Sequence, residues 1–84
     1  MGFCVYILSS LRNGKLYVGH TENLERRLTQ HNQGQGGKFT KQQGPWELVY
    51  SEEQLDRSAA MSRELYLKSV EGFAEKKRLA GRNS

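Results

Sequence analysis

The apolar positions of this 84-residue chain fall into short runs separated by polar segments. Residues 3–8, FCVYIL, form a run rich in aromatic and β-branched side chains, which predicts a buried strand. A second strand is expected at residues 15–19, and the Asn13-Gly14 pair before it is typical of a hairpin turn. The two strands are therefore expected to be antiparallel neighbours.

Helical spacing follows in residues 23–32, where Leu24 and Leu28 lie four positions apart. Residues 33–45 are rich in glycine and contain the only proline, which indicates a loop. Residues 46–51, WELVYS, then alternate as expected for a third strand.

The C-terminal part predicts a helix from residue 56 to about residue 70 and a basic helical turn at residues 74–80. Four side chains of the first helix are expected to face the sheet: Ala59, Ala60, Leu67 and Val70. Residues 81–84 are expected to fray. The pattern predicts one α+β domain over residues 1–80, with a small three-stranded antiparallel sheet flanked by helices in the order β-β-α-β-α-α.

Charge and composition narrow the class of protein. Thirteen Lys and Arg against nine Asp and Glu give a formal net charge of +4, which favours a polyanionic partner or serves solubility alone, depending on where the charges lie. Cys4 is the only cysteine, which excludes an internal disulfide and a thiolate metal cluster within one chain. No stretch approaches the roughly 20 apolar residues of a membrane span, so a cytoplasmic protein without membrane contact is expected.

Two tyrosines of the expected hairpin, Tyr6 and Tyr17, should lie on one face because side chains alternate along a strand. A two-residue turn would place Tyr17 opposite Ser10, whereas a loop over residues 9–14 would place it opposite Tyr6. Only a loop longer than two residues brings the phenols close. The alternative is that both tyrosines simply pack as amphipathic core residues.

Arg27 and His31 lie four positions apart on the expected first helix and so share one side of it. An arginine can hold phosphate oxygens by two parallel hydrogen bonds, and a histidine can donate to the same phosphate or move a proton. The alternative is a solvated helix edge in which Arg27 pairs with a carboxylate.

Glu64 interrupts the apolar side of the second helix, which is unfavourable unless the carboxylate is paired or binds a metal ion. Lys68, one turn later, can form an ion pair with it. A mostly hydrated Mg²⁺, completed by substrate phosphate, is the other possibility. Because glycine-rich phosphate loops, paired zinc histidines and nucleophilic serine arrangements do not occur in the sequence, metal-assisted attack of water on phosphate is the chemistry left open.

Five segments in order resemble the GIY-YIG endonuclease domain, especially its short stand-alone bacterial members: CVYIL, KLYVG, ERRLTQHN, PWELVY and RELYLK. The similarity extends to about Lys77. It implies an endonuclease that hydrolyses phosphodiester bonds in nucleic acid, expected to be DNA, with one divalent ion, Mg²⁺ or Mn²⁺. Structure-selective or weakly specific cleavage is expected, with a protein partner as a possible source of further specificity.

Carried onto this chain, the resemblance gives each candidate a role. It implies Tyr6 as general base or water-positioning group and Tyr17 as a ligand of phosphate or water. It implies Arg27 as the transition-state clamp and His31 as a support of the scissile phosphate. It implies Glu64 as the metal ligand. His20 stands where repair-type members have lysine. A tyrosine needs help to act as a general base, because its unperturbed pKa is about 10, and a neighbouring His20, Arg27 or metal-bound water could supply that help.

Two departures from the family pattern are visible. Cys4 and Val5 replace the first Gly-Ile, and lysines stand where many members have a late asparagine. Five basic residues are expected to bind the nucleic-acid backbone: Lys38, Lys41, Lys76, Lys77 and Arg78. A non-catalytic nucleic-acid-binding module of the same fold, or a protein-interaction domain, remains the alternative function.

Overall fold

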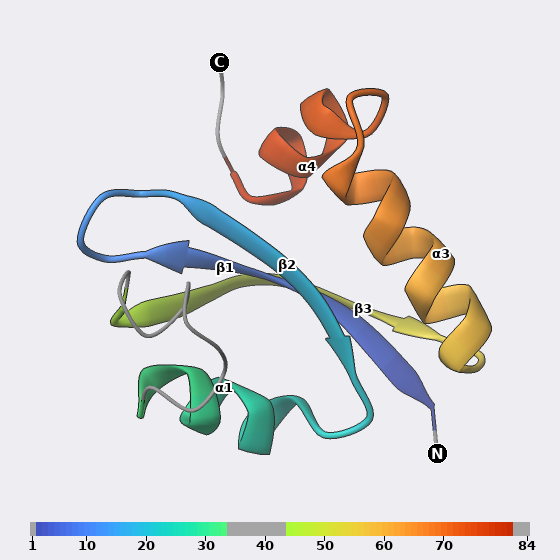
Figure 1. The fold of residues 1–84 in the computed structure, drawn as a ribbon, viewed down its shortest axis with the longest axis horizontal. Helices are drawn as coiled ribbons and strands as arrows, with labels where there is room; N and C mark the ends of the chain where they lie inside the picture. The colour runs from blue at the N-terminus through green and yellow to red at the C-terminus, as the bar shows by residue number, and fades with distance from the viewer. Residues whose placement is uncertain (1, 34–43, 82–84) are drawn as a thin grey trace.

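The computed structural model describes residues 2–33 and 44–81, which form an antiparallel sheet with helices on both faces (Figure 1). The strands lie in the order β2-β1-β3 and are β1 (Phe3–Ser10), β2 (Leu16–Thr21) and β3 (Trp46–Gln54). The helices are α1 (Leu24–Asn32), α3 (Arg57–Lys68) and α4 (Phe73–Leu79). The predicted α+β class, the three-stranded sheet and the β-β-α-β-α-α order are confirmed.

Residues 11–14 form the loop of the β1–β2 hairpin. The backbone N–H of Ser10 donates to the carbonyl of Lys15 at 2.8 Å, and the N–H of Gly14 donates to the carbonyl of Ser10 at 2.8 Å. Gly14 has a φ of 78°, a conformation that glycine adopts without the steric cost that a Cβ would add. The connection is therefore longer than a two-residue turn.

The hairpin register places Tyr17 opposite Leu8 and Tyr6 opposite Gly19. Both expected pairings of Tyr17, with Ser10 and with Tyr6, are wrong, because the observed loop is intermediate in length between the two that were considered. Tyr17 lies two positions from Gly19, the residue opposite Tyr6, and residues two apart on a strand share a face. Tyr6 and Tyr17 therefore do lie on one face of the sheet. That part of the prediction is confirmed.

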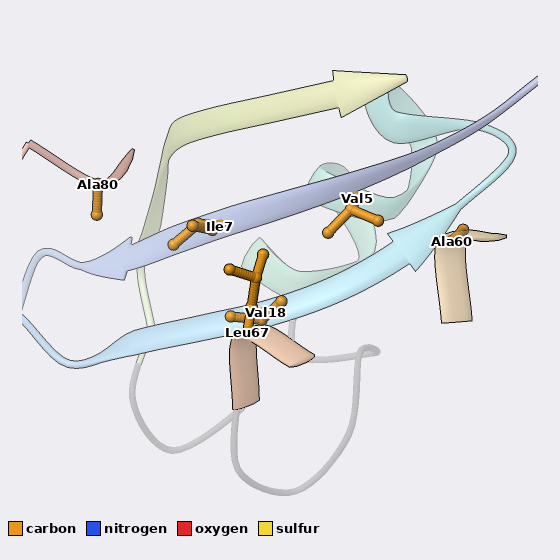
Figure 2. Close-up of a cluster of buried hydrophobic side chains, with 6 residues drawn as sticks. All are labelled: Val5, Ile7, Val18, Ala60, Leu67 and Ala80. Carbon is orange, nitrogen blue, oxygen red and sulfur yellow. The ribbon is translucent and has the colours of Figure 1, made fainter. Parts of the chain in front are cut away.

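The face covered by α3 and α4 carries an aliphatic core (Figure 2). Its buried members are Val5, Ile7, Val18, Ala60, Leu67 and Ala80. Fully burying a valine, isoleucine or leucine contributes about 1.5–3 kcal/mol, so this cluster is a main source of stability. Val70 does not join it and is 90% exposed. The expectation that Val70 faces the sheet is wrong because α3 already ends at Lys68.

The opposite face, covered by α1, has a second core that is more aromatic and polar. Tyr6, Leu8 and Trp46 are buried there, with Tyr17, Leu24 and Leu28 packed against them. The Leu24/Leu28 spacing of the sequence therefore marks the side of α1 that contacts the sheet.

Side-chain caps define where α1 and α3 begin. Asn23 accepts a hydrogen bond from the backbone of Arg26 at 3.0 Å, and Asp56 accepts one from the backbone of Ala59 at 2.8 Å. Such caps typically stabilise a helix by about 1 kcal/mol. Both helices begin near the end of the sheet where β1 starts and β2 ends (Figure 1). In the part of the chain that the structure describes, every helix is too short and too polar to cross a membrane.

Candidate active site

Tyr6 and His31 form a buried pair between the sheet and α1. The Tyr6 hydroxyl lies 2.9 Å from His31 Nε2, and both residues are only 1% exposed. Burial raises the pKa of the Tyr6 hydroxyl far above its usual value, Tyr17 acts in the same direction, and the nearby Arg27 acts against it. Tyr6 is therefore held as a neutral hydroxyl rather than as a phenolate.

His31 is held neutral by the same surroundings. Burial lowers the pKa of its imidazole, and the positive charge of Arg27 lowers it further. A neutral imidazole has one N–H donor and one acceptor nitrogen. When Tyr6 donates to Nε2, the ring proton is on Nδ1, which has no hydrogen-bond partner among the described residues. His31 Nε2 is thus placed to accept a proton from Tyr6.

The Tyr17 ring packs beside this pair and beside Trp46. Its ring centroid lies 6.4 Å from that of Tyr6, 5.0 Å from that of His31 and 6.1 Å from that of Trp46. These separations are within the favourable range for aromatic pairs. The two phenols are close, and the hairpin loop is longer than two residues, which is the condition expected for their proximity. Trp46 was not among the candidate residues.

Gly19, opposite Tyr6 on β2, makes room for the Tyr6 phenol. A Cβ at this position would lie 2.6 Å from the Tyr6 hydroxyl oxygen and 2.7 Å from Tyr6 Cζ. Both distances are shorter than real Cβ atoms tolerate, and the phenol is a rigid, buried neighbour. The glycine of the YVG segment is therefore required by close approach of a side chain to the β2 backbone.

Glu64 reaches the same region from α3, around the edge strand β2. His20 Nδ1 lies 2.5 Å from Glu64 Oε1, and Lys68 Nζ donates to Glu64 Oε2 at 2.6 Å. Lys68 Nζ also lies 5.7 Å from the centroid of the Tyr17 ring. Because β2 is an edge strand, polar groups from both faces of the sheet meet around it.

The Glu64 carboxylate is suited to a hard cation. Its burial acts to raise the pKa of the carboxyl, but the hydrogen bonds from Lys68 and His20 outweigh it and hold the pKa below its usual value. Its side chain is 17% exposed, so a hydrated ion can reach it. In residues 2–33 and 44–81 no three His, Cys, Asp or Glu side chains converge on one point. An ion here would depend on Glu64, water and substrate phosphate, as Mg²⁺ sites often do.

The ion pair expected between Glu64 and Lys68 is present. The His20 ring nitrogen Nδ1 forms its hydrogen bond with Glu64, a partner 44 residues away, and not with a tyrosine hydroxyl. The sequence offered no signal for this pairing, because it depends on how α3 packs across β2.

Arg27 lies half-buried on α1, and its Nη1 donates to Gln30 Oε1 at 3.3 Å. Within the described ranges Arg27 forms no salt bridge with a carboxylate. The alternative of a solvated helix edge, in which Arg27 pairs with a carboxylate, is therefore not observed there. Arg27 lines a pocket of about 300 Å³ together with His20. Arg26 and Arg57 also line it, and neither was a candidate residue. The adjacent arginines in ERRLTQHN were the one available signal.

Of the five basic residues expected to bind a nucleic-acid backbone, the three within the described ranges lie on α4. Lys38 and Lys41 lie outside the described residues. Lys76 and Lys77 place their ammonium groups over the Phe73 ring of their own helix, at 5.3 and 5.4 Å from its centroid. Those two lysines and Arg78, all on α4, do not line the pocket.

The chain is similar to known proteins over most of its length. Residues 2–78 match the model of the GIY-YIG catalytic domain. A UPF0213 protein of Oceanobacillus iheyensis is 41% identical over 73 residues, which cover 87% of this chain and 84% of the relative. A UPF0213 protein of Natronomonas pharaonis is 45% identical over 75 residues, covering 89% and 86%. The solution NMR structure of a UPF0213 protein from Bacillus halodurans is similar with a TM-score of 0.55 and 30% identity, covering 95% of this chain and 84% of that one.

Proposed function

Because this chain belongs to the GIY-YIG catalytic domain family, we propose that it is a metal-dependent endonuclease that hydrolyses phosphodiester bonds in DNA. The observation that carries the proposal is the 2.9 Å contact between the Tyr6 hydroxyl and the neutral His31, with Arg27 beside it. A hydroxyl with a proton acceptor can activate water, and a guanidinium that has no salt bridge among the described residues can bind the phosphate. We include in the proposal that the protein acts in the cytoplasm, where a nucleic-acid substrate is found.

Tyr6 and His31 act as a relay that activates water. A phenolate at Tyr6 is scarce because burial raises the pKa of its hydroxyl. The attacking water therefore donates its proton to the Tyr6 oxygen while the Tyr6 proton passes to His31 Nε2. General base catalysis of this kind contributes about 10²–10⁴ in rate. In this arrangement His31 acts through Tyr6, which differs from the direct phosphate support that the resemblance implied.

Arg27 and Tyr17 hold the phosphate. The Arg27 guanidinium can donate two parallel hydrogen bonds to non-bridging oxygens, where negative charge develops during the reaction. Tyr17 is half-buried beside Tyr6 and can donate its hydroxyl to the phosphate or to the water. Removing one such donor typically costs about 10²–10³ in rate.

Glu64 is the residue that would hold a Mg²⁺ or Mn²⁺ ion. The bound ion would neutralise phosphate charge and lower the pKa of a coordinated water. His20 and Lys68 orient the carboxylate through its two oxygens. We therefore assign His20 and Lys68 as positioning residues for the metal ligand.

The test is cleavage of a panel of labelled DNAs, comprising duplex, branched and single-stranded forms, with Mg²⁺ or Mn²⁺. The wild-type chain should cleave at least one of them, and a chelator should stop the reaction. Glu64→Gln should abolish cleavage and weaken metal binding measured by calorimetry. Glu47→Gln, which removes an exposed carboxylate of β3, is the matched control and should cleave normally. Unchanged cleavage or unchanged metal binding in the Glu64 variant would refute the assignment.

A non-catalytic nucleic-acid-binding module is the second candidate function. It is favoured by one observation, that both Glu64 oxygens already have partners in His20 and Lys68. In that case DNA binding would be independent of divalent ions and none of the panel would be cut. Replacing Glu64 would then remove chiefly an ion pair, worth about 0.2–0.5 kcal/mol on a helix surface.

A further inference from the structure

A positively charged pocket lies where β1 begins, β2 ends, and both α1 and α3 start. We call it the arginine pocket. It is lined by Phe3, His20, Thr21, Glu22, Arg26, Arg27, Gln30 and Arg57, and its volume is about 300 Å³. This is at the lower end of the range for small-molecule sites, so it has room for a phosphate group with part of its nucleotide.

The charge of the arginine pocket is not compensated by the described residues. Arg26, Arg27 and Arg57 face one carboxylate, Glu22, and none of the described acidic side chains forms a salt bridge with these three arginines. Arg63 on the same helix as Arg57 is different, because Glu52 and Glu75 hold its guanidinium at 2.9 and 2.6 Å. An anion bound in the pocket would give its arginines a negatively charged partner, as Glu52 and Glu75 do for Arg63.

Two of the three guanidiniums are positioned by neighbours that leave their charge available. The Arg57 guanidinium lies over the Phe3 ring, 5.4 Å from its centroid, and Arg27 is oriented by Gln30. A neutral aromatic ring and a neutral amide restrict the side chains without neutralising them. Planar guanidiniums held in this way favour phosphate, which they bind through two parallel hydrogen bonds.

We propose that the arginine pocket is a second phosphate-binding subsite, which holds a phosphate of the bound strand next to the one that is cut. The proposal rests on the function proposed above and adds to it the way in which the strand is held. Arg27 and His20 line the pocket and also belong to the candidate active site, so the two phosphate positions are neighbours. Arg57 and Arg26 belong to the subsite alone.

The first experiment measures binding of a fluorescein-labelled DNA duplex at several salt concentrations, with chelator present so that no cleavage occurs. Arg57→Gln should lower the slope of log affinity against log salt by about 0.9, the value for one lost phosphate contact. Arg57→Lys should keep the slope and weaken binding, because lysine retains the charge without the paired hydrogen bonds. Arg12→Gln is the matched control, since this arginine lies in the hairpin loop at the other end of β1.

An unchanged slope in Arg57→Gln, or an equal decrease in Arg12→Gln, would overturn the subsite. Because the Arg57 side chain packs on Phe3, Arg26→Gln provides a second variant whose side chain is exposed. It should lower the slope as Arg57→Gln does, and a slope equal to that of the wild type would count against the proposal.

The second experiment follows the arginine Nε–H signals by NMR during titration with inorganic phosphate. Signals of Arg26 and Arg57 should shift in a saturable way, the Arg12 signal should not, and the DNA duplex should displace the phosphate. Phosphate binding that DNA does not displace would assign the pocket to a free anion and overturn a strand subsite. Absence of shifts would overturn any phosphate site. Both experiments omit divalent ions, so a chain that binds DNA through this pocket but never cleaves it would refute the proposed endonuclease and leave the subsite standing.

Discussion

The two faces of the sheet use different chemistry to cover the same strands. Val5 and Ile7 of β1 face α3 and α4 within an aliphatic core (Figure 2). Tyr6 and Leu8 face α1 within the second, more aromatic core. Alternation along one strand separates them, because successive side chains point to opposite faces. One strand therefore supplies stability on one face and candidate chemistry on the other.

The difference lies in what each face gains from burial. The aliphatic face contributes about 1.5–3 kcal/mol for each large side chain that is removed from water. On the other face the Tyr6 hydroxyl and His31 are buried with each other as partners, and such a hydrogen bond has a net value of only about 0.5–1.5 kcal/mol. Substitutions on the aliphatic face should therefore affect mainly stability, and those on the α1 face mainly activity.

The largest expected effect is on cleavage by Tyr6→Phe. Loss of the hydroxyl removes the water-activating group and should reduce the single-turnover cleavage rate by about 10²–10⁴. The free energy of unfolding should fall by only about 1–3 kcal/mol, from the acceptor left unpaired on His31. Tyr50→Phe is the matched control, because this hydroxyl donates to Glu52 and lies outside the candidate site. Equal cleavage rates for the Tyr6 and Tyr50 variants would show that the α1 face has no special role in cleavage.

The next effect is on stability, from Leu67→Ala in the aliphatic core. Leu67 is fully buried, so truncation should lower the free energy of unfolding by about 2–5 kcal/mol, measured in urea. The cleavage rate per folded molecule should stay unchanged. Leu65→Ala on the same helix, where the side chain is 66% exposed, should change stability by no more than about 0.5 kcal/mol. A loss of specific activity in the folded Leu67 variant would show that the two faces are coupled.

Gly19→Ala should affect both properties, because Gly19 lies under the Tyr6 phenol. The added methyl group would meet the Tyr6 oxygen at 2.6 Å, so the ring must shift from its present position beside His31. Overpacking of this kind costs about 1–3 kcal/mol, and cleavage should fall with the displaced hydroxyl. Urea unfolding and the NMR signals of Tyr6 and His31 measure the two effects. Wild-type values in both would contradict the close approach.

The smallest expected effect is the pH dependence of stability from His31. Burial lowers the pKa of His31 in the folded state, so between that pKa and about 6.5 the unfolded chain binds more protons. Stability should therefore fall as the pH decreases below about 6.5, by up to about 1.4 kcal/mol for each unit of pKa shift. Glu52 and Glu64 also have lowered pKa values and lose their contribution only below about 4.5. Urea unfolding of His31→Gln should show a flatter profile in the higher window, and an unchanged profile would exclude His31 as the cause.

Local patterns in the sequence were sufficient for much of the fold and for the face that several candidate site residues occupy. Alternation predicted that Tyr6 and Tyr17 share a face, and helical spacing placed Arg27 and His31 on one side of α1, because both depend only on neighbouring residues. Glu64 stood out since a carboxylate in an apolar stripe needs a partner. The hairpin register was predicted incorrectly, because the loop length depends on the backbone hydrogen bond between Ser10 and Lys15.

Tertiary packing decided which of these residues meet. Glu64 finds His20 across 44 residues, and Arg57 joins Arg26 and Arg27 in one pocket only because α1 and α3 begin at the same end of the sheet. Nothing in the spacing of these residues predicts their distance, since it results from how each helix packs against the strands. The sequence by itself determined which face of a strand or helix each side chain occupies, through local periodicity. The tertiary structure decided which faces come together, through the burial that brings remote segments into contact.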